Sequence, residues 1–359
     1  MKKLGKGLLI VSMVISLTGC SWGVKSNIIE EISPTILKYI DREPDGQLKV
    51  STLIPPLRKE KKRVITEKAR LEKEARNEIS QKYYRELKSG QLRMLFLSKR
   101  LARTDILPIL NTWMLDPEIS HRLYLAVVEG DFVSFLHHQL QVQELIDFNL
   151  YQMFSHYEQQ GEINVTNLHR FMEAYFSPYA DSMVPLFTLK DNELTYKGTA
   201  LFREGKMVGE ITSLDDILFQ MLSHKNWFQK TLPLPEQGII LGSLYTESKV
   251  TAPPSGDVKI QVGLKGKVDE YQGKRNLNQS KEVKQLTREL ESVLEQKITR
   301  IMHQLQQWRV DPLRVGERTL GPLSQPYSEK SWKAAWPDKR IDVKVRLQLE
   351  SLGLLELTK

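Results

Sequence analysis

The chain has 359 residues, a length that predicts two or three domains. Its formal net charge is +8, but 44 acidic residues are interspersed among 52 basic ones, so the composition does not indicate a nucleic-acid-binding protein. Cys20 is the only cysteine, and this excludes an intrachain disulfide.

The first 20 residues have the pattern of a bacterial signal peptide that ends in a lipidation site. Three lysines precede an uncharged run that begins at Gly7, and Leu17-Thr18-Gly19-Cys20 has the form of a lipobox. We expect cleavage between Gly19 and Cys20 and an S-diacylglycerol group on the Cys20 thiol. N-acylation of the new terminus, for example with palmitate, is a further option. Two acyl chains would hold the protein stably on a membrane.

Two other interpretations of this segment stay open. The uncharged run from Gly7 to Val24 is just long enough for an uncleaved transmembrane anchor, although its glycines and serines weaken that interpretation. An ordinary signal peptide that contains a cysteine is the other option. No later segment resembles a membrane span, so the remainder is expected to be a water-soluble ectodomain.

The beginning of the N-terminal domain, predicted over residues 20–185, contains elements of several kinds. The isoleucine spacing over residues 28–40 predicts a short amphipathic helix, and Leu48–Ile54 is predicted to be a strand. The most charged stretch is residues 58–76. We interpret it as a solvated loop that leads into a helix ending near Leu87, and a patch that contacts lipid headgroups is the alternative.

From residue 92 onward, strands and helices alternate in the pattern of an α/β layered domain. Leu92–Leu97 and Arg122–Val128 are short apolar runs that predict buried strands. Three side chains are placed to cap the helices that follow them: Asp105, Asp131 and Thr166. We interpret Asp181–Pro185 as a linker to a second domain.

The C-terminal domain is predicted over residues 186–359, with an optional division near residue 250 into a small hairpin-and-helix domain and a sheet with a long helix. Thr199–Arg203 and Lys206–Ile211 predict a hairpin. The elements expected next are a helix capped at Ser213 and strands at Gly238–Tyr245 and Val258–Leu264.

The strongest predicted helix covers Lys281–Trp308, where apolar residues recur at spacings of three and four. Ile341–Leu349 alternates apolar and polar side chains, which predicts a half-buried strand of an antiparallel sheet. One long helix on such a sheet is an α+β arrangement. The predicted fold is therefore an α+β, lipid-anchored ectodomain of two to three mixed α/β domains.

No catalytic, metal-binding or cofactor-binding motif can be identified. The seven histidines are scattered, and the chain contains no His-Glu-x-x-His pattern, Gly-rich phosphate loop or Gly-x-Ser-x-Gly elbow. Asp215 and Asp216 are adjacent, but we interpret them as part of a helix cap. We therefore expect a non-enzymatic, membrane-tethered binding or structural protein without a cofactor.

Four stretches of the chain carry a resemblance to a known family. They are the lipobox; Leu-Pro-Ile-Leu-Asn-Thr-Trp at 107–113 with Asp116-Pro117-Glu118; Gly-Thr-Ala-Leu-Phe at 198–202 with Met-Val-Gly at 207–209; and Asp311-Pro312-Leu313 with Gly316, Trp332 and Trp336-Pro337. In order and spacing they resemble the Ger(x)C family of spore germination lipoproteins, the C subunits of nutrient germinant receptors.

This resemblance implies an outward-facing lipoprotein on the inner membrane of the spore that acts in nutrient-triggered germination. It also implies assembly with membrane-embedded A and B receptor subunits and no enzymatic activity. Direct contact with the nutrient germinant is left open. As the candidate partner interface we single out five residues: Gly209, Asp311, Gly316, Trp332 and Trp336.

Two other classes of protein are alternatives. A solute-binding lipoprotein of a membrane transporter would have two similar α/β lobes with a ligand cleft between them. A lipid-anchored hydrolase would need a nucleophile and a base, which the sequence does not supply. The receptor hypothesis instead predicts no deep closed cleft and at least one sizeable interface.

Overall fold

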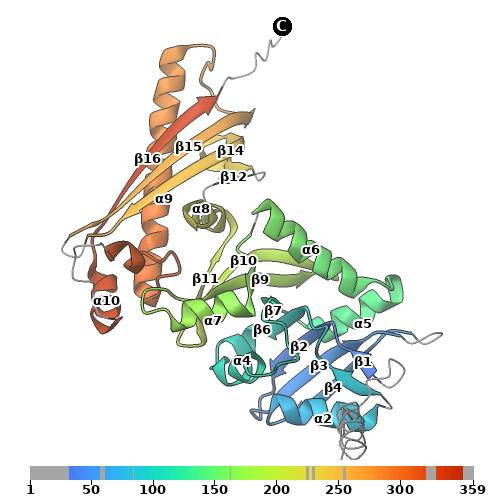
Figure 1. Cartoon of the computed structure of the whole chain (residues 1–359). Coiled ribbons are helices and arrows are strands. Elements are labelled where there is room, and N and C mark those ends of the chain that lie inside the picture. Colours follow the sequence, from blue (N-terminus) through green and yellow to red (C-terminus); the bar gives the residue numbers. More distant parts are fainter. Residues whose placement is uncertain are drawn as a thin grey trace, which may run out of the picture.

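The computed structural model describes residues 32–56, 61–83, 85–161, 163–223, 226–228, 231–253, 256–320 and 329–350. Cys20 lies outside these ranges, so the lipobox and the cleavage site stay predictions. The described part has a large mixed sheet at one end and a smaller sheet with a long helix at the other (Figure 1). This arrangement confirms the predicted α+β fold class.

A nine-stranded sheet forms the N-terminal part of the molecule. Its strand order is β11-β10-β9-β7-β6-β2-β3-β4, and the short β8 pairs with β7. The four central strands β2, β6, β7 and β9 run parallel, and antiparallel hairpins extend both edges. The strands are β2 (Leu37–Arg42), β3 (Leu48–Ile54), β4 (Arg63–Ala69), β6 (Met94–Ser98), β7 (Tyr124–Glu129), β8 (Thr166–Asn167), β9 (Met183–Lys190), β10 (Glu193–Arg203) and β11 (Lys206–Thr212).

Helices cover both faces of this sheet, which explains why β6 and β7 are continuous apolar runs. Alternate side chains of these strands enter two separate cores, with Leu95 in one and Phe96 in the other. Helices α4 and α7 contribute to the first core, and α5 and α6 to the second. The helices of this part are α2 (Glu72–Lys82), α3 (Lys99–Ala102), α4 (Leu107–Met114), α5 (Phe132–Val142), α6 (Ile146–Gln160) and α7 (Leu168–Phe176).

Two predictions near the N-terminus are wrong. The isoleucine-rich segment forms strands β1 (Ile32–Pro34) and β2 instead of a helix. The charged stretch forms β4 before α2 begins, and α2 ends well before Leu87, which lies in β5 (Glu86–Lys88). In both places β-branched side chains pair with neighbouring strands, and this pairing overrides the local helical pattern.

The predicted caps are confirmed in part. Asp131 caps α5 by accepting a hydrogen bond from the backbone N–H of Ser134. Asp105 accepts one from Leu107 just ahead of α4. For α7 the prediction is wrong by one residue, because Asn167 provides the cap while Thr166 pairs in β8.

The segment interpreted as a linker, Asp181–Pro185, runs directly into β9. This strand pairs with β7, and β10 and β11 follow by hairpins, so the sheet continues to Thr212. The linker prediction is therefore wrong: the pairing partner of β9 lies more than 50 residues earlier in the chain. The nine-stranded sheet extends past residue 185, and the division into domains stays a proposal.

A five-stranded sheet with the long helix α9 (Ser280–Trp308) forms the C-terminal part. Its strand order is β12-β14-β15-β16, with β13 paired to β14. The predicted hairpin of β10 and β11 and the predicted helix at Ser213 precede it. The remaining elements are α8 (Ser213–Ser223), β12 (Asn226–Phe228), β13 (Leu232–Leu234), β14 (Ile239–Thr251), β15 (Val258–Tyr271), α10 (Glu329–Ala335) and β16 (Ile341–Glu350).

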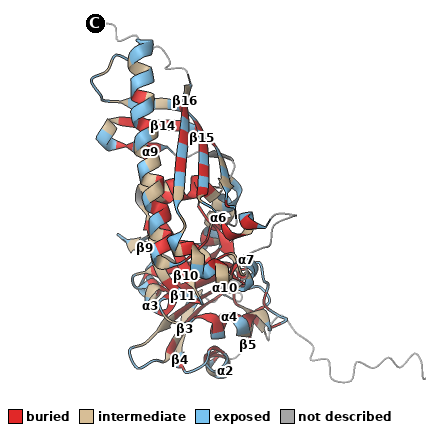
Figure 2. Cartoon of the chain, turned by 90° about the vertical axis from the view of Figure 1, so that its left-hand side faces the viewer, coloured by how far each residue is buried: buried red, intermediate tan, exposed pale blue. Residues whose placement is uncertain are grey.

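The last strand shows the predicted alternation, with Val343, Val345 and Leu347 buried toward α9. Figure 2 shows the same alternation of buried and exposed positions along β15 and β16. However, β16 runs parallel to β15, whereas we predicted antiparallel pairing. The connection through α9 returns the chain to the end of the sheet where β15 starts, and parallel strands require such a crossover.

Candidate functional site

Four of the five residues singled out as a partner interface meet in one place, just after α9. The carboxylate of Asp311 accepts hydrogen bonds from the backbone N–H groups of Val315 (2.8 Å) and Gly316 (2.7 Å). It also accepts one from the indole Nε1 of Trp332 at 3.2 Å. We call Asp181, Asp311, Gly316, Trp332 and Trp336 the junction cluster.

The two indole rings of the junction cluster are packed in the interior. Trp332 and Trp336 are each 2% exposed, and their ring centroids lie 5.5 Å apart. The Trp336 Nε1 donates to the carbonyl of Val310 at 2.8 Å. A Cβ at Gly316 would lie 2.5 Å from the Trp332 Nε1, so only glycine fits beside this ring. The cluster is thus a packed joint within the chain.

Hydrogen bonds connect this joint to the N-terminal sheet. The Oδ2 of Asp181, just ahead of β9, accepts a hydrogen bond from the N–H of Asp311 at 2.7 Å, and the Asp181 N–H donates to the Asp311 carbonyl at 3.2 Å. On β10, Arg203 donates to the carbonyl of Trp308 at 3.1 Å. Gly209 on β11 approaches the same tryptophan, because a Cβ there would lie 2.4 Å from the Trp308 ring. All five singled-out residues therefore lie at or beside this joint, and their role in a partner interface stays a prediction.

Burial raises the pKa values of both carboxyl groups in the joint. The pKa of Asp311 is raised to about 7, chiefly by burial; the N–H donors of Gly316 and Val315 oppose this rise, and the nearby Asp181 adds to it. Burial likewise raises the pKa of Asp181. Two acids side by side in a low-dielectric joint make its stability depend on their protonation.

The adjacent acids at the start of α8 make tertiary contacts that the capping interpretation did not predict. Asp216 is 2% exposed and accepts hydrogen bonds from the hydroxyls of Tyr196 (2.8 Å) and Thr199 (2.7 Å) on β10. Asp215 accepts hydrogen bonds at 2.9 and 3.0 Å from Arg300 on α9. The pair therefore ties α8 to both sheet regions, and each acid already has its own partners.

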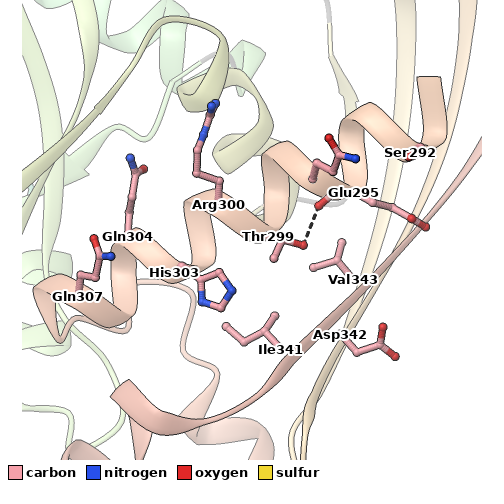
Figure 3. Close-up of a pocket in the computed structure, with 11 residues that line it drawn as sticks. Ser292, Glu295, Thr299, Arg300, His303, Gln304, Gln307, Ile341, Asp342 and Val343 are labelled. Carbon is pink, nitrogen blue, oxygen red and sulfur yellow. Dashed lines mark hydrogen bonds between the residues drawn. The ribbon is translucent and has the colours of Figure 1, made fainter. Parts of the chain in front are cut away.

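An open groove of about 730 Å³ lies between α9 and the start of β16 (Figure 3). Polar side chains line most of it, and His303 Nδ1 lies 3.0 Å from the amide oxygen of Gln306. An amide is neither an acid nor a base at ordinary pH, so this pair does not form a catalytic dyad. The groove fits a contact surface better than a reaction site.

Two glutamates of α9 shield the outer edge of β16 beside this groove. The carboxylate of Glu295 accepts a hydrogen bond from the N–H of Val345 at 3.0 Å, and that of Glu291 accepts one from Leu347 at 2.8 Å. These N–H groups would otherwise be open to pairing with another strand. Covering an edge in this way limits unwanted association.

Within the described ranges, no three histidine, cysteine, aspartate or glutamate side chains gather as potential metal ligands. The part of the chain that the structure describes also contains no helix that is both long and apolar enough to span a bilayer.

Sequence reasoning missed two residues of the joint. Asp181 was placed in a linker and Arg203 in a hairpin, yet Asp181 binds the segment that follows α9 and Arg203 binds the last residue of α9. Their partners are 130 and 105 residues away in the chain. No local pattern indicates contacts at that separation, and in the sequence Asp311-Pro312 indicated only the end of the long helix.

Comparisons with known proteins agree with this architecture. A family model described as "Spore germination protein N-terminal domain" matches residues 25–189, and one described as "Spore germination B3/ GerAC like, C-terminal" matches residues 197–353. The chain is 23% identical to spore germination protein GerQC of Bacillus cereus, over 97% of this chain and 99% of that protein. The crystal structure of the GerBC protein matches with a TM-score of 0.54 at 14% identity, over 88% of this chain and 97% of that chain.

The structural match supports the fold, and the two family models show to which protein family the chain belongs. Together the two models cover most of the chain, in the order in which the two sheets occur. The chain therefore belongs to the Ger(x)C family of spore germination proteins.

Proposed function

We propose that this chain is the C subunit of a spore germinant receptor and acts, without enzymatic activity, in nutrient-triggered germination. The observation that carries the proposal is the match of both family models along nearly the whole chain. The internal geometry agrees with it, because the buried acids of the junction cluster and of α8 are engaged in structural hydrogen bonds.

The proposed attachment is a lipid anchor on Cys20 that holds the protein on the outer face of the spore inner membrane. Leu17-Thr18-Gly19-Cys20 supports cleavage before the cysteine and acylation of its thiol. Two acyl chains suffice for stable anchoring, whereas one gives only reversible binding. The residues between Cys20 and β1 would then tether the folded part to the bilayer.

We further propose that the protein assembles with the membrane-embedded A and B subunits. The junction cluster supports this role indirectly, because it fixes how the C-terminal helix and sheet sit on the N-terminal sheet. A partner that contacts both parts would then meet one defined surface. The polar groove along α9 is an open surface beside this region (Figure 3).

The alternative, a solute-binding lipoprotein of a transporter, is less well supported. It requires two similar lobes around a cleft. The two parts of this chain differ: one sheet has four parallel central strands covered on both faces, while the other is mostly antiparallel and carries one long helix.

The test is a Cys20→Ala substitution, followed by fractionation of dormant spores and a nutrient germination assay. Without the thiol there is no site for the diacylglyceryl group. We expect the protein to leave the inner-membrane fraction and the nutrient response to be lost. Ser21→Ala, a substitution at the neighbouring residue, should change neither the inner-membrane location nor the nutrient response. Immunoblots of whole spores will show that both variants are made at normal levels.

Co-purification extends the test to the partners. The A and B subunits should be retained by the tagged wild-type chain after detergent extraction of spore membranes. If the Cys20→Ala protein stays membrane-bound and germination is normal, the anchor proposal is wrong. If the anchored chain retains neither subunit, the assembly proposal is wrong.

A further inference from the structure

A pocket of about 730 Å³ opens at the amino-terminal edge of the nine-stranded sheet, where β6 and β7 begin. Its lining comes from the segments that lead into these two strands and from α6 and α7. Three arginines, Arg93, Arg122 and Arg170, line it together with a single carboxylate, Glu158. We call this hollow the amino-edge pocket.

The positive charge of this pocket is not neutralised by the chain itself. The guanidinium of Arg122 makes no hydrogen bond or ion pair with any residue that the structure describes. The guanidinium of Arg93 lies over the ring of Tyr151 at 4.9 Å, and only Arg170 approaches Glu158, at 3.5 Å. Three cations against one anion leave a formal surplus of two positive charges in the pocket.

Glu158 is itself shared, which weakens its hold on Arg170. Its carboxylate accepts a hydrogen bond from the hydroxyl of Tyr124 at 2.7 Å, a closer contact than the one to the arginine. The ring centroids of Tyr124 and Tyr151 lie 5.9 Å apart. Tyr124 bonds Glu158 and Tyr151 lies under Arg93, so the two neighbouring rings link the carboxylate to this guanidinium. The aromatic floor therefore holds one guanidinium plane in place before any ligand binds.

The opposite edge of the same strands has a different charge balance. A hollow of about 610 Å³ there is lined by four cations and four anions. They are Lys49, Lys99, Arg100 and Arg103, with Asp41, Glu43, Glu129 and Asp131. Arg100 pairs with Asp41 at 2.6 Å and Lys99 with Glu129 at 3.1 Å. Ligands of open α/β sheets usually bind at this carboxyl edge, but here the chain neutralises its own charges, and the surplus lies at the amino edge.

We propose that the amino-edge pocket binds a phosphate-type oxyanion, which Arg93, Arg122 and Arg170 hold. The planar guanidinium fork matches the oxygens of such an anion and gives two parallel charge-assisted hydrogen bonds. Ser120 and Asn167, the residue that caps α7, add neutral polar side chains to the lining. The proposal stands on the charge and shape of the pocket, and only the lipid headgroup as the source of the anion rests on the proposed Cys20 anchor.

The anion could be free phosphate or the phosphate of a lipid headgroup, and the chain's path makes the second source accessible. The N–H of Arg93 donates to the carbonyl of Ile36, so the entry into β2 lies beside the pocket. Ile32 comes 12 residues after Cys20. A fully extended segment of that length spans about 40 Å, so an acylated Cys20 would keep this edge near the headgroups.

The test uses the full-length protein in a neutral detergent and isothermal titration calorimetry. One arm titrates sodium phosphate, and the other titrates dihexanoyl phosphatidylglycerol at the same ionic strength. Arg122→Gln and Arg93→Gln each remove one guanidinium from the pocket. Arg288→Gln is the matched control, because Arg288 is exposed on α9 and has no ion pair within the described ranges. Circular dichroism checks that each variant is folded.

We expect saturable binding that either pocket substitution weakens by about tenfold or more and that Arg288→Gln leaves unchanged. Binding of phosphate with this pattern assigns the site to the free anion. Binding of only the lipid, with the same pattern, assigns it to the headgroup. If neither probe binds saturably, or if Arg288→Gln weakens binding as much as Arg122→Gln, the proposal is overturned. Either result leaves the outcome of the Cys20→Ala test unaffected.

Discussion

The two sheets of this protein bury their side chains in different ways. The central strands of the N-terminal sheet are covered by helices on both faces, and β6 is buried at all its positions. The C-terminal sheet is covered on one face by α9, so every second residue of β15 and β16 lies in solvent. A strand between two layers is apolar throughout, whereas a strand under one layer alternates. The difference in the pattern of apolar and polar residues along the strands therefore reflects whether helices cover one face of the sheet or both.

The joint between the sheets differs from both cores, because polar groups dominate it. Asp311 and Asp181 lie at its centre, and backbone N–H groups and an indole satisfy their oxygens. An apolar core tolerates many exchanges of similar volume, but a buried polar network loses a whole hydrogen bond with each change. This contrast leads to three predictions about stability.

The largest effect is expected in the core that is covered on both faces. Phe96 contacts the rings of Phe132 and Phe154, with centroids at 4.5 and 5.8 Å. Phe96→Ala should lower the free energy of unfolding by about 4 kcal/mol, through lost burial and the cavity it leaves. The comparison is Leu347→Ala on the edge strand β16, which should cost about 2 kcal/mol because neighbours can collapse there more easily. Urea denaturation followed by tryptophan fluorescence measures both, and equal costs would contradict the difference between the two sheets.

The second effect concerns the joint and its dependence on pH. The pKa of Asp311 is raised to about 7, so between pH 4 and 7 the folded chain keeps a proton that the unfolded chain releases. Stability should therefore be highest near pH 4, as far as this group is concerned, and should fall as the pH rises to 7 by at most about 4 kcal/mol. The raised pKa of Asp181 acts in the same direction.

Thermal unfolding between pH 4 and 8 will measure this component. In Asp311→Asn, the fall in stability between pH 4 and 7 that is due to this group should disappear. The variant should also be less stable at every pH, because an amide is a poorer acceptor for three donors. The control is Asp342→Asn, which changes an exposed acid on β16. A pH profile that is the same in Asp311→Asn and the wild type would refute this assignment.

The smallest effect is expected at the shielded edge of β16. Removing the carboxylates with Glu291→Ala and Glu295→Ala leaves the N–H groups of Leu347 and Val345 open to solvent. The cost should be about 1 kcal/mol, since water replaces the lost bonds. Faster hydrogen exchange at these two amides and a greater tendency to self-associate in sedimentation velocity should accompany it. Ser292→Ala on the same helix should change neither property, and unchanged exchange in the double variant would show that the shielding has no effect.

Predictions from sequence were reliable where the information is local. The hairpin around Glu204-Gly205, the strand Leu48–Ile54 and the helix α9 were predicted because turn residues and apolar spacing specify them without distant partners. The joint was predicted only as a set of unusual residues. Asp311, Gly316, Trp332 and Trp336 stood out by type and spacing, but nothing indicated that they are buried together.

Most of the errors share one physical cause, which is strand pairing that the pattern of a single segment does not reveal. Strand β4 lies in a segment with a helical charge pattern, and it is a strand because β3 offers its edge. The segment taken for a linker begins β9, whose partner β7 is separated from it by three helices. The direction of β16 follows from the α9 crossover and is not visible in its alternation, which is the same for parallel and antiparallel strands.

The sequence by itself determined the alternation and helical stripes, the candidate anchor at Cys20 and the resemblance to its family, because these depend on residue type and short spacing. Only the tertiary structure decided which strands pair, where Asp181 meets Asp311, and that three arginines from separate segments line one pocket. Contacts of this kind bring together residues far apart in the chain. Their stability comes from burial and hydrogen bonding in the folded state, and local secondary-structure propensity predicts neither of these.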